Sequence, residues 1–232
     1  MTTPWLTVVT PCLNARAHVD PMLASVARQL GEPGEIEHLV FDAGSTDGTI
    51  DALARCPHIT LIREPDGSAH EAMNKGISRA RGDIITFVNT DDLVEDGAIA
   101  AARARFAAVP TLEILAGRAI VFSDQAGTIG PEISRIERHG DGLALDELMY
   151  GVPAINARYF RRRLFARIGS FDIDFLISAD REFLLRAALA KAQGRVIDRV
   201  LYRYRQHVGS RTLDPDQRLT RGSAFFSKTT KR

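Results

Sequence analysis

Short apolar runs alternate with more polar segments through the first half of the chain. The runs are rich in β-branched residues and are typical of buried strands, which we predict at residues 6–10, 36–41, 59–62 and 83–88. The segments between them carry helix-start and helix-stop residues, and we predict helices at residues 20–30, 49–55 and 68–80. Strands and helices that alternate over such short connections predict a parallel sheet covered by helices.

Local signals place the ends of these elements. Pro11 is expected to stop the first strand, and Asp20 followed by Pro21 predicts an N-cap with proline at the first helical position. Ser68 and Glu71 have the spacing of a capping box at the start of the third helix.

The pattern changes in the second half of the chain. After a predicted helix at residues 95–108, residues 114–122 and 128–135 flank a turn-rich segment and predict a β-hairpin. A further helix is predicted at residues 179–193 and a last strand at residues 196–205.

The bulk composition is that of an ordinary globular protein. The chain has 232 residues, of which 45% are hydrophobic and 25% are charged, enough for a sizeable core in one domain or two fused halves. The formal net charge of +1 argues against a nucleic-acid partner, since binding DNA or RNA requires neutralising many phosphates. Cys12 and Cys56 have neither CxxC nor zinc-finger spacing, which favours reduced thiols in a cytoplasmic protein.

The sequence predicts no membrane span. The N-terminus lacks a basic region followed by an apolar one, and no apolar stretch approaches the length that crosses a bilayer. We therefore expect a cytoplasmic protein that is at most peripheral to the inner membrane face. Residues 211–232 are polar and basic, and we expect a loosely held tail or a short surface helix there; contact with a membrane surface is the weaker alternative.

An acidic run follows the fourth predicted strand. Asn89, Thr90, Asp91 and Asp92 stand where that strand ends, and ligands of α/β domains bind at the carboxyl ends of parallel strands. Two adjacent carboxylates with few cations near them in the sequence repel each other unless a positive group lies between them. A divalent metal that carries a phosphate is the group we expect.

Residues 42–49 form a turn-rich segment after the second predicted strand. A carboxylate at such a strand end, here Asp42, accepts hydrogen bonds from a nucleobase or a ribose, and glycines let a ligand approach the backbone. A plain helix-capping turn is at least as good an explanation of this segment taken alone. It is neither a P-loop nor a dinucleotide fingerprint.

The polar segment at residues 63–76 follows the third predicted strand and runs into a helix. Such a loop at a helix N-terminus suits an anionic diphosphate. The alternatives are that Asp66 is only a turn residue and that Arg63 pairs with a surface carboxylate. Asn74 is unfavourable in a helix interior, so it either makes a specific hydrogen bond or is solvated.

Four motifs in order carry a resemblance to a known family. They lie at residues 7–15, at 42–49, at 64–67 with 72–76, and at 89–92. Together they resemble the family 2 glycosyltransferases of the GT-A fold, most closely the bacterial branch that builds exopolysaccharides and lipopolysaccharides. The likeness covers roughly residues 5 to 210.

The resemblance implies an α/β protein with the GT-A fold. Its central sheet would be Rossmann-like, mostly parallel and flanked by helices, with a smaller mixed region on the acceptor side. Residues 1–115 would form the half that binds the nucleotide-sugar donor, residues 116–210 the acceptor half of the same domain, and residues 211–232 a basic tail.

The resemblance also implies the donor site. Its members would be Thr10, Pro11, Asn14, Asp42, Arg63, Asp66, Asn74 and Asp91. The metal, Mn²⁺ or Mg²⁺, would bridge the two phosphates and be held by Asp91, Asp92 and His207, although a surface histidine explains His207 equally well. Asn89 stands at a position where this branch often has Asn in place of Asp.

On the acceptor side, the resemblance implies that Asp180 is the general base that takes the proton of the attacking hydroxyl. Glu182 is a weaker substitute, and the structural alternative is that Asp180 only caps its helix. Asn156 and Ala157 stand where the family usually has His and Gln, which leaves acceptor recognition open. The run from Arg161 to Arg163 is more often a solvated helix start than a phosphate site.

These features together predict a metal-dependent, inverting glycosyltransferase. It would move a sugar, most plausibly from a UDP-sugar, to a hydroxyl of a glycan or lipid-linked acceptor. No nucleophile with an adjacent base is evident in the sequence, which favours direct displacement. The alternatives are a non-catalytic nucleotide-sugar-binding paralogue and a sugar-nucleotide nucleotidyltransferase, although the glycine-rich loop of the latter is replaced here by residues 11–14.

Overall fold

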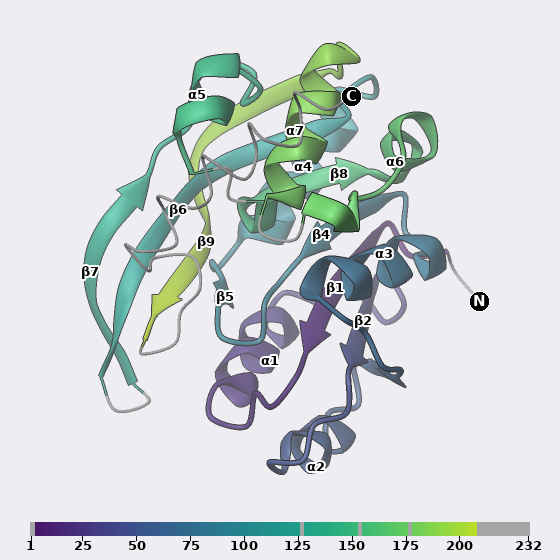
Figure 1. Cartoon of the computed structure of the whole chain (residues 1–232), viewed down its shortest axis with the longest axis vertical. Helices are drawn as coiled ribbons and strands as arrows, with labels where there is room; N and C mark the ends of the chain where they lie inside the picture. Colours follow the sequence, from purple (N-terminus) through teal and green to yellow (C-terminus); the bar gives the residue numbers. More distant parts are fainter. Residues whose placement is uncertain (1–2, 126–127, 153–154, 176–177, 208–232) are drawn as a thin grey trace.

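The computed structural model describes residues 3–125, 128–152, 155–175 and 178–207. Its strands form one mixed sheet, in the order β3-β2-β1-β4-β8-β6-β9-β5, with β7 paired to β6 (Figure 1). The strands are β1 (Leu6–Cys12), β2 (Ile36–Asp42), β3 (Thr60–Arg63), β4 (Ile84–Phe87), β5 (Leu93–Val94), β6 (Ile114–Gln125), β7 (Thr128–Ile136), β8 (Arg158–Arg161) and β9 (Gly194–Gln206).

The first part of the sheet is parallel, as the sequence predicts. β1 lies between β2 and β4, and β3 lies outside β2, all running in the same direction. β6 and β9 share that direction, whereas β5, β7 and β8 run against it. The hairpin expected in the second half is confirmed as β6 and β7, and with β9 it forms a long curved ribbon (Figure 1). β6 spans the expected division between residues 115 and 116, so one sheet runs through both halves.

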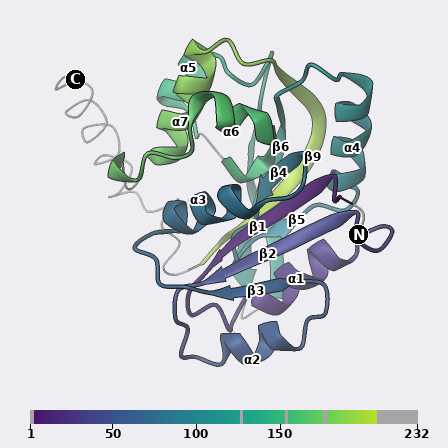
Figure 2. The same cartoon turned by 90° about the vertical axis from the view of Figure 1, so that its right-hand side faces the viewer.

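Helices cover both faces of this sheet. They are α1 (Val19–Ala27), α2 (Thr49–Ala54), α3 (Ala69–Arg79), α4 (Ala98–Ala108), α5 (Leu145–Tyr150), α6 (Arg162–Ile168) and α7 (Ala179–Leu189), with short 3₁₀ turns η1 (Ile155–Ala157) and η2 (Ile173–Phe175). Figure 2 shows α3 on one side of β1 and β2 and α1 on the other. No helix within the described ranges is long and apolar enough to cross a membrane.

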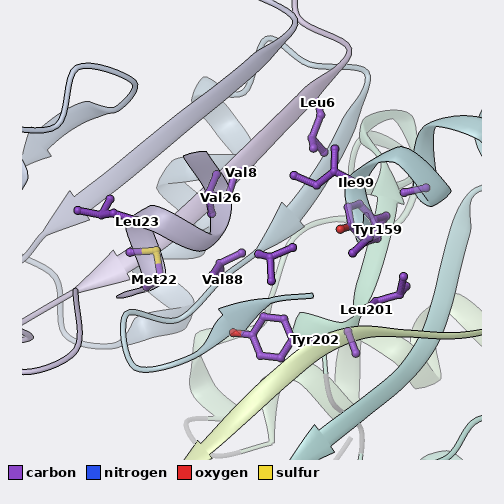
Figure 3. Close-up of a cluster of buried hydrophobic side chains, with 14 of the residues drawn as sticks. Leu6, Val8, Met22, Leu23, Val26, Val88, Ile99, Tyr159, Leu201 and Tyr202 are labelled. Carbon is purple, nitrogen blue, oxygen red and sulfur yellow. The ribbon is translucent and has the colours of Figure 1, made fainter. Parts of the chain in front are cut away.

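Strand alternation divides the core into two clusters. Leu6 and Val8 of β1 point into one cluster with α1, α2 and α4, while Val9 points into the other with α3, α5, α6 and α7. Figure 3 shows part of the first cluster, including Leu6 and Leu201. On the other face, a Cβ at Gly76 would lie 2.3 Å from Cγ1 of Val9, so glycine is what lets α3 approach β1 this closely.

Several predicted boundaries were wrong. β1 continues through Pro11 to Cys12, because β4 pairs with β1 only as far as Val9 and Pro11 needs no N–H on that side. α1 begins at Val19, with Pro21 inside the first turn where a missing N–H costs nothing, and it ends at Ala27.

Two other helices are shorter than predicted. α4 begins at Ala98, after the left-handed residue Gly97. α7 ends at Leu189, before the left-handed residue Lys191. By contrast, the capping residue Ser68 is confirmed: its hydroxyl accepts the N–H of Glu71 at 3.2 Å, while the carboxylate of Glu71 accepts the N–H of Gly67.

Candidate functional site

The loops that follow β1 and β2 are joined by hydrogen bonds at the carboxyl edge of the sheet. Asn14, at φ 49°, donates its backbone N–H to Oγ of Ser45 at 2.8 Å, and its Oδ1 accepts the N–H of Thr46 at 2.9 Å. The next two residues add a bond each, from Ala15 to Thr49 and from Arg16 to Asp47. The predicted donor residue Asn14 therefore joins the loops after β1 and β2 into one hydrogen-bonded frame.

Two other predicted donor residues lie beneath this frame. The hydroxyl of Thr10 is fully buried, 2.9 Å from Nε2 of His38. Asp42 is also fully buried: Oδ1 accepts the N–H groups of Gly44 and Ser45 at 3.0 Å, and Oδ2 accepts the Ser45 hydroxyl. A nucleobase reaches Asp42 only if residues 43–45 move aside, and this contact stays a prediction. Pro11 is partly exposed above them.

The segment after β3 presents a mixed set of charges. Arg63 is exposed at the end of β3, and Asp66 is partly buried, which raises the pKa of its carboxyl group. Nζ of Lys75 donates to the carbonyl of Pro65 at 2.5 Å and lies 3.3 Å from Glu71. Arg63 and Asp66 are thus placed where a ligand at the sheet edge can meet them.

Asn74 makes a specific hydrogen-bond pair with another part of the chain. Its amide donates to the carbonyl of Phe171 at 2.8 Å and accepts the N–H of the same residue at 3.0 Å. Both amide atoms are therefore engaged by backbone, and the structure points to a linking role for Asn74 in place of direct donor contact.

The acidic turn after β4 separates its two carboxylates. Asp91 is partly exposed, and its Oδ2 lies 3.1 Å from Nε2 of His207, at the end of β9. Asp92 is buried: Oδ1 accepts the N–H of Arg205 at 2.8 Å, and Oδ2 accepts the Tyr202 hydroxyl and the Asn89 amide at 3.0 and 3.1 Å. Burial, with Asp91 nearby, raises the pKa of Asp92, and these three donors oppose that rise.

Arg205 supplies the positive charge that the sequence seemed to lack near the acidic run. Its guanidinium is buried, and Nε donates to the carbonyl of Asp91 at 2.8 Å while Nη1 lies 2.7 Å from Asp124. It also lies over the ring of Phe122, at 4.9 Å from the centroid. The turn is therefore fixed from β9 by backbone, hydroxyl and guanidinium donors.

His18 joins this end of the site and is not among the candidate residues that the sequence indicates. It precedes α1, and its ring lies 4.8 Å from that of His207, centroid to centroid. Burial, and then the nearby Arg205 and His207, lower the pKa of His18. Nothing in the local sequence marks this residue, because the contact joins positions that are far apart in the chain.

The predicted base lies at the start of α7. Asp180 is partly buried, and its Oδ1 accepts the N–H of Arg181 at 2.8 Å. Glu182, the alternative base, is engaged by Arg186 through both carboxylate oxygens, at 2.8 and 2.7 Å. Glu182 is therefore tied to its own helix, and Asp180 is the freer carboxylate at this position.

Tyr204, on β9, is buried beside Tyr202. Burial raises the pKa of Tyr204, the charges of Asp92 and Asp180 raise it further, and the charge of Arg138 opposes them. The hydroxyl donates to Oδ1 of Asn156 at 3.3 Å. β9 therefore contributes to both sides of the site, which the sequence did not indicate beyond His207.

The two positions that depart from the family pattern are interior. Asn156 is buried between the carbonyl of Phe87, at 3.4 Å, and the Tyr204 hydroxyl. Ala157 is fully buried in the hydrophobic core. The departure thus alters what packs beneath the site. Arg161, on β8, pairs with Asp83, and α6 begins at Arg162, as the helix-start reading of this run expected.

The chemistry of Asp91 and His207 fits a divalent metal. A carboxylate oxygen and an imidazole nitrogen are both common ligands, and a nucleoside diphosphate and water supply further oxygens in such sites. Within the described ranges, no group of three or more His, Cys, Asp or Glu side chains is arranged to hold a metal by itself. Asp91 and His207 would thus provide a partial set of ligands, whereas both oxygens of Asp92 are already hydrogen-bonded to Asn89, Tyr202 and Arg205.

Comparisons with known proteins show what the chain is similar to. Residues 7–169 match the model of the family described as Glycosyl transferase family 2. An uncharacterised glycosyltransferase of Mycobacterium tuberculosis is 32% identical over 192 residues, which cover 80% of this chain and 70% of the relative. A PGL/p-HBAD biosynthesis glycosyltransferase of Mycobacterium bovis is 29% identical over 193 residues, with the same coverage.

Solved structures of GT-A glycosyltransferases share the fold. Residues 1–349 of S. aureus TarS in complex with UDP-GlcNAc superpose with a TM-score of 0.70 at 18% identity, over 90% of this chain and 60% of that one. A mannosyltransferase from Pyrobaculum calidifontis in complex with GDP-Man and Mn²⁺ has a TM-score of 0.66 at 21% identity, over 100% of this chain and 66% of that one. The expected GT-A fold is confirmed, and the chain spans less than two thirds of TarS 1–349.

Proposed function

Because this chain belongs to glycosyl transferase family 2, we propose that it is a metal-dependent, inverting glycosyltransferase. It transfers a sugar from a nucleoside diphosphate donor to a hydroxyl of a glycan or lipid-linked acceptor. UDP-sugars are the first donors to test, since the related fold of TarS holds UDP-GlcNAc; GDP-Man, bound by the archaeal mannosyltransferase, is the second.

The pairing of Asp91 with His207 is the observation that carries this proposal. Asp91 lies in the turn between β4 and β5, and His207 follows β9, which pairs with β5. The two side chains meet at 3.1 Å at the carboxyl edge of the sheet. Both side chains are partly exposed, at 34% and 22%, so they can meet a ligand from solvent. This is the place where an α/β sheet binds its ligand.

Asp91 and His207 are the residues that hold Mn²⁺ or Mg²⁺ in this proposal. When bound, the ion offsets the negative charge that builds on the departing nucleoside diphosphate. Asp92, with its oxygens engaged by Tyr202, Asn89 and Arg205, acts as a positioning residue that fixes the turn beneath Asp91.

The donor lies across the ends of β1, β2 and β3. The frame formed by the loop of Asn14 and the loop after Asp42 holds the nucleoside, with Pro11 against it. Arg63 and Asp66 extend that surface beyond β3. Because the frame is tied together before any ligand arrives, little ordering is needed on binding.

Asp180 takes the proton from the acceptor hydroxyl. As that oxygen forms its bond to the anomeric carbon, the bond from that carbon to the diphosphate breaks and its electron pair leaves on the diphosphate oxygen. Attack from the side opposite the leaving group inverts the anomeric centre. Asp180 stands at the start of α7 with a partly exposed carboxylate whose Oδ1 accepts the N–H of Arg181, and this placement supports its role as the base.

A donor screen with point variants tests this proposal. Nucleoside diphosphate sugars are screened by thermal shift with Mn²⁺, since a bound ligand raises the unfolding temperature, and hits are assayed for hydrolysis and transfer. We expect Asp91→Ala to lose metal-dependent binding and Asp180→Asn to bind normally but turn over slowly. Unchanged turnover in both variants would show that the site is misassigned.

Two outcomes of the screen would replace the proposal. Binding without turnover from any donor, with the binding abolished in Asp91→Ala, would identify a non-catalytic nucleotide-sugar binder. Formation of a nucleotide sugar from a nucleoside triphosphate and a sugar phosphate would identify a nucleotidyltransferase.

A further inference from the structure

His18 lies against the metal end of the proposed donor site. Its ring is 4.8 Å from the ring of His207, centroid to centroid, with 38° between the ring planes. His207 in turn directs Nε2 to Oδ2 of Asp91 at 3.1 Å. An imidazole that packs on another in this way limits the rotation of its neighbour.

The backbone holds His18 firmly in this place. Its N–H donates to the carbonyl of Ala15 at 2.9 Å, and α1 begins at the next residue. The same short loop carries Asn14, which is bonded to Ser45 and Thr46 in the nucleoside frame. The side chain of His18 is carried by this loop and packs on His207, the proposed metal ligand that follows β9.

Nδ1 of His18 is buried and has no hydrogen-bond partner among the residues that the structure describes. A buried ring nitrogen without a partner does not stabilise the fold through that atom. The contact that the structure shows for this imidazole is the packing of its ring against the ring of His207. That contact involves the whole ring and does not depend on Nδ1.

We propose that His18 is a positioning residue of the donor site, which packs on His207 and keeps its imidazole directed at the metal position beside Asp91. This inference rests on the proposed function, because it assumes that His207 is a metal ligand. This role connects the two ends of the donor site. The loop that carries His18 also carries Asn14 of the nucleoside frame, and His18 itself orients His207, the proposed metal ligand beside the diphosphate.

Mn²⁺ binding with UDP, measured by electron paramagnetic resonance titration, tests the inference without relying on turnover. Loss of a group that orients a metal ligand weakens metal affinity about 10-fold or more. We expect that loss in His18→Ala and recovery to within about twofold in His18→Phe, which keeps a flat ring but has no nitrogen. His139→Ala, which removes an exposed histidine that follows β7, is the matched control.

Three results would overturn the inference. Affinity in His18→Ala equal to that of the wild type would show that the ring pair does not position His207. Affinity in His18→Phe as weak as in His18→Ala would show that a nitrogen matters and not the packing. Absence of Mn²⁺ binding in the wild type would instead refute the proposed function and remove this inference with it. Thermal unfolding of each variant without metal shows whether a loss comes from misfolding.

Discussion

Asn74 and Phe171 exchange two hydrogen bonds across 97 positions of the chain. The side-chain amide of Asn74 both donates to and accepts from the backbone of Phe171, at 2.8 and 3.0 Å. The pair joins α3, which follows the segment of Arg63 and Asp66, to the segment that leads into η2 and α7. Asp180 lies at the start of α7. The side chain of Asn74, within α3, thus supplies the hydrogen-bond partners for the backbone N–H and carbonyl of Phe171.

Asn74→Ala tests the strength of this link. Leaving both backbone groups of Phe171 unsatisfied should lower the free energy of unfolding by about 1–3 kcal/mol. Urea denaturation measures the effect, with Ser78→Ala, at an exposed position of the same helix, as the control. A loss no larger than that of the control would mean that water replaces the amide at no cost.

Asp91 and Asp92 are neighbours with opposite expected phenotypes. Asp92→Asn places an amide N–H₂ group where Tyr202, Asn89 and Arg205 already donate hydrogen bonds, so donor faces donor. We therefore expect a loss of about 3 kcal/mol in the free energy of unfolding. Asp91→Asn should keep the stability and lose several kcal/mol of transition-state stabilisation, about 100-fold or more in kcat. Equal stability of the two variants in urea would contradict the structural role of Asp92.

Asp180→Asn should slow the transfer step and spare donor binding. A general base contributes about 10²- to 10⁴-fold to the rate, and this loss should appear in kcat, with the affinity for Mn²⁺ and UDP unchanged. Glu182→Gln is the matched control two residues along the same helix, because its carboxylate is already held by Arg186. A larger loss of kcat in Glu182→Gln than in Asp180→Asn would exchange the two assignments.

The nature of the ligands predicts a preference for Mn²⁺ over Mg²⁺. Mg²⁺ binds oxygen ligands in strict octahedral geometry, whereas the nitrogen of His207 is better suited to a transition metal. After a chelator has abolished sugar transfer, added Mn²⁺ should therefore restore more activity than added Mg²⁺. In His207→Asp, the activities restored by the two metals should be closer to each other. Full recovery by Mg²⁺ in the wild type would argue that His207 is not a ligand.

His38 predicts a pH dependence of stability that is independent of catalysis. Burial, with His58 nearby, lowers the pKa of His38 from the usual 6.5 to about 3. Between these values the unfolded chain binds a proton that the folded chain does not. The contribution of His38 to the free energy of unfolding is therefore fully present above pH 6.5. As the pH drops below that value, the free energy of unfolding falls by at most about 1.4 kcal/mol per pH unit.

Urea unfolding measured above and below pH 6.5 checks this dependence. His38→Gln, which can still hydrogen-bond to Thr10, should show a shallower fall than the wild type. His139→Gln, at an exposed position, should keep the slope of the wild type. Identical slopes in all three proteins would mean that His38 is protonated in the folded state.

The parallel part of the fold was predictable because its signals are local. Runs such as Leu6–Cys12 are apolar and β-branched, and the hydroxyl of Ser68 caps α3 within three residues. The sequence did not predict β8, because the arginines at both ends of this strand are typical of surface positions. In the structure Arg158 is fully buried, and its guanidinium donates a hydrogen bond to the carbonyl of Gly142.

The local sequence indicates candidate site residues where they follow a strand, and the family resemblance adds others such as His207 and Asp180. Asp91 lies in the turn after β4, but its contact with His207 and the support of Asp92 by Tyr202 join positions more than 100 residues apart. The same distance hides His18, whose neighbours on the chain give no reason to bring it to His207. Burial of Asp92 beside the partly exposed Asp91 depends on how β9 enters the sheet, which no local pattern specifies.

The bonds from β9 to Asp92 have a consequence for synthesis on the ribosome. The acidic turn leaves the exit tunnel early, whereas Tyr202 and Arg205, which hold Asp92, follow 110 and 113 residues later. A nascent chain that has made every acidic residue of the turn still lacks the strand that shapes it. A chain that stops before β9 therefore lacks the partners of Asp92, and we expect it to lack the donor site that we propose.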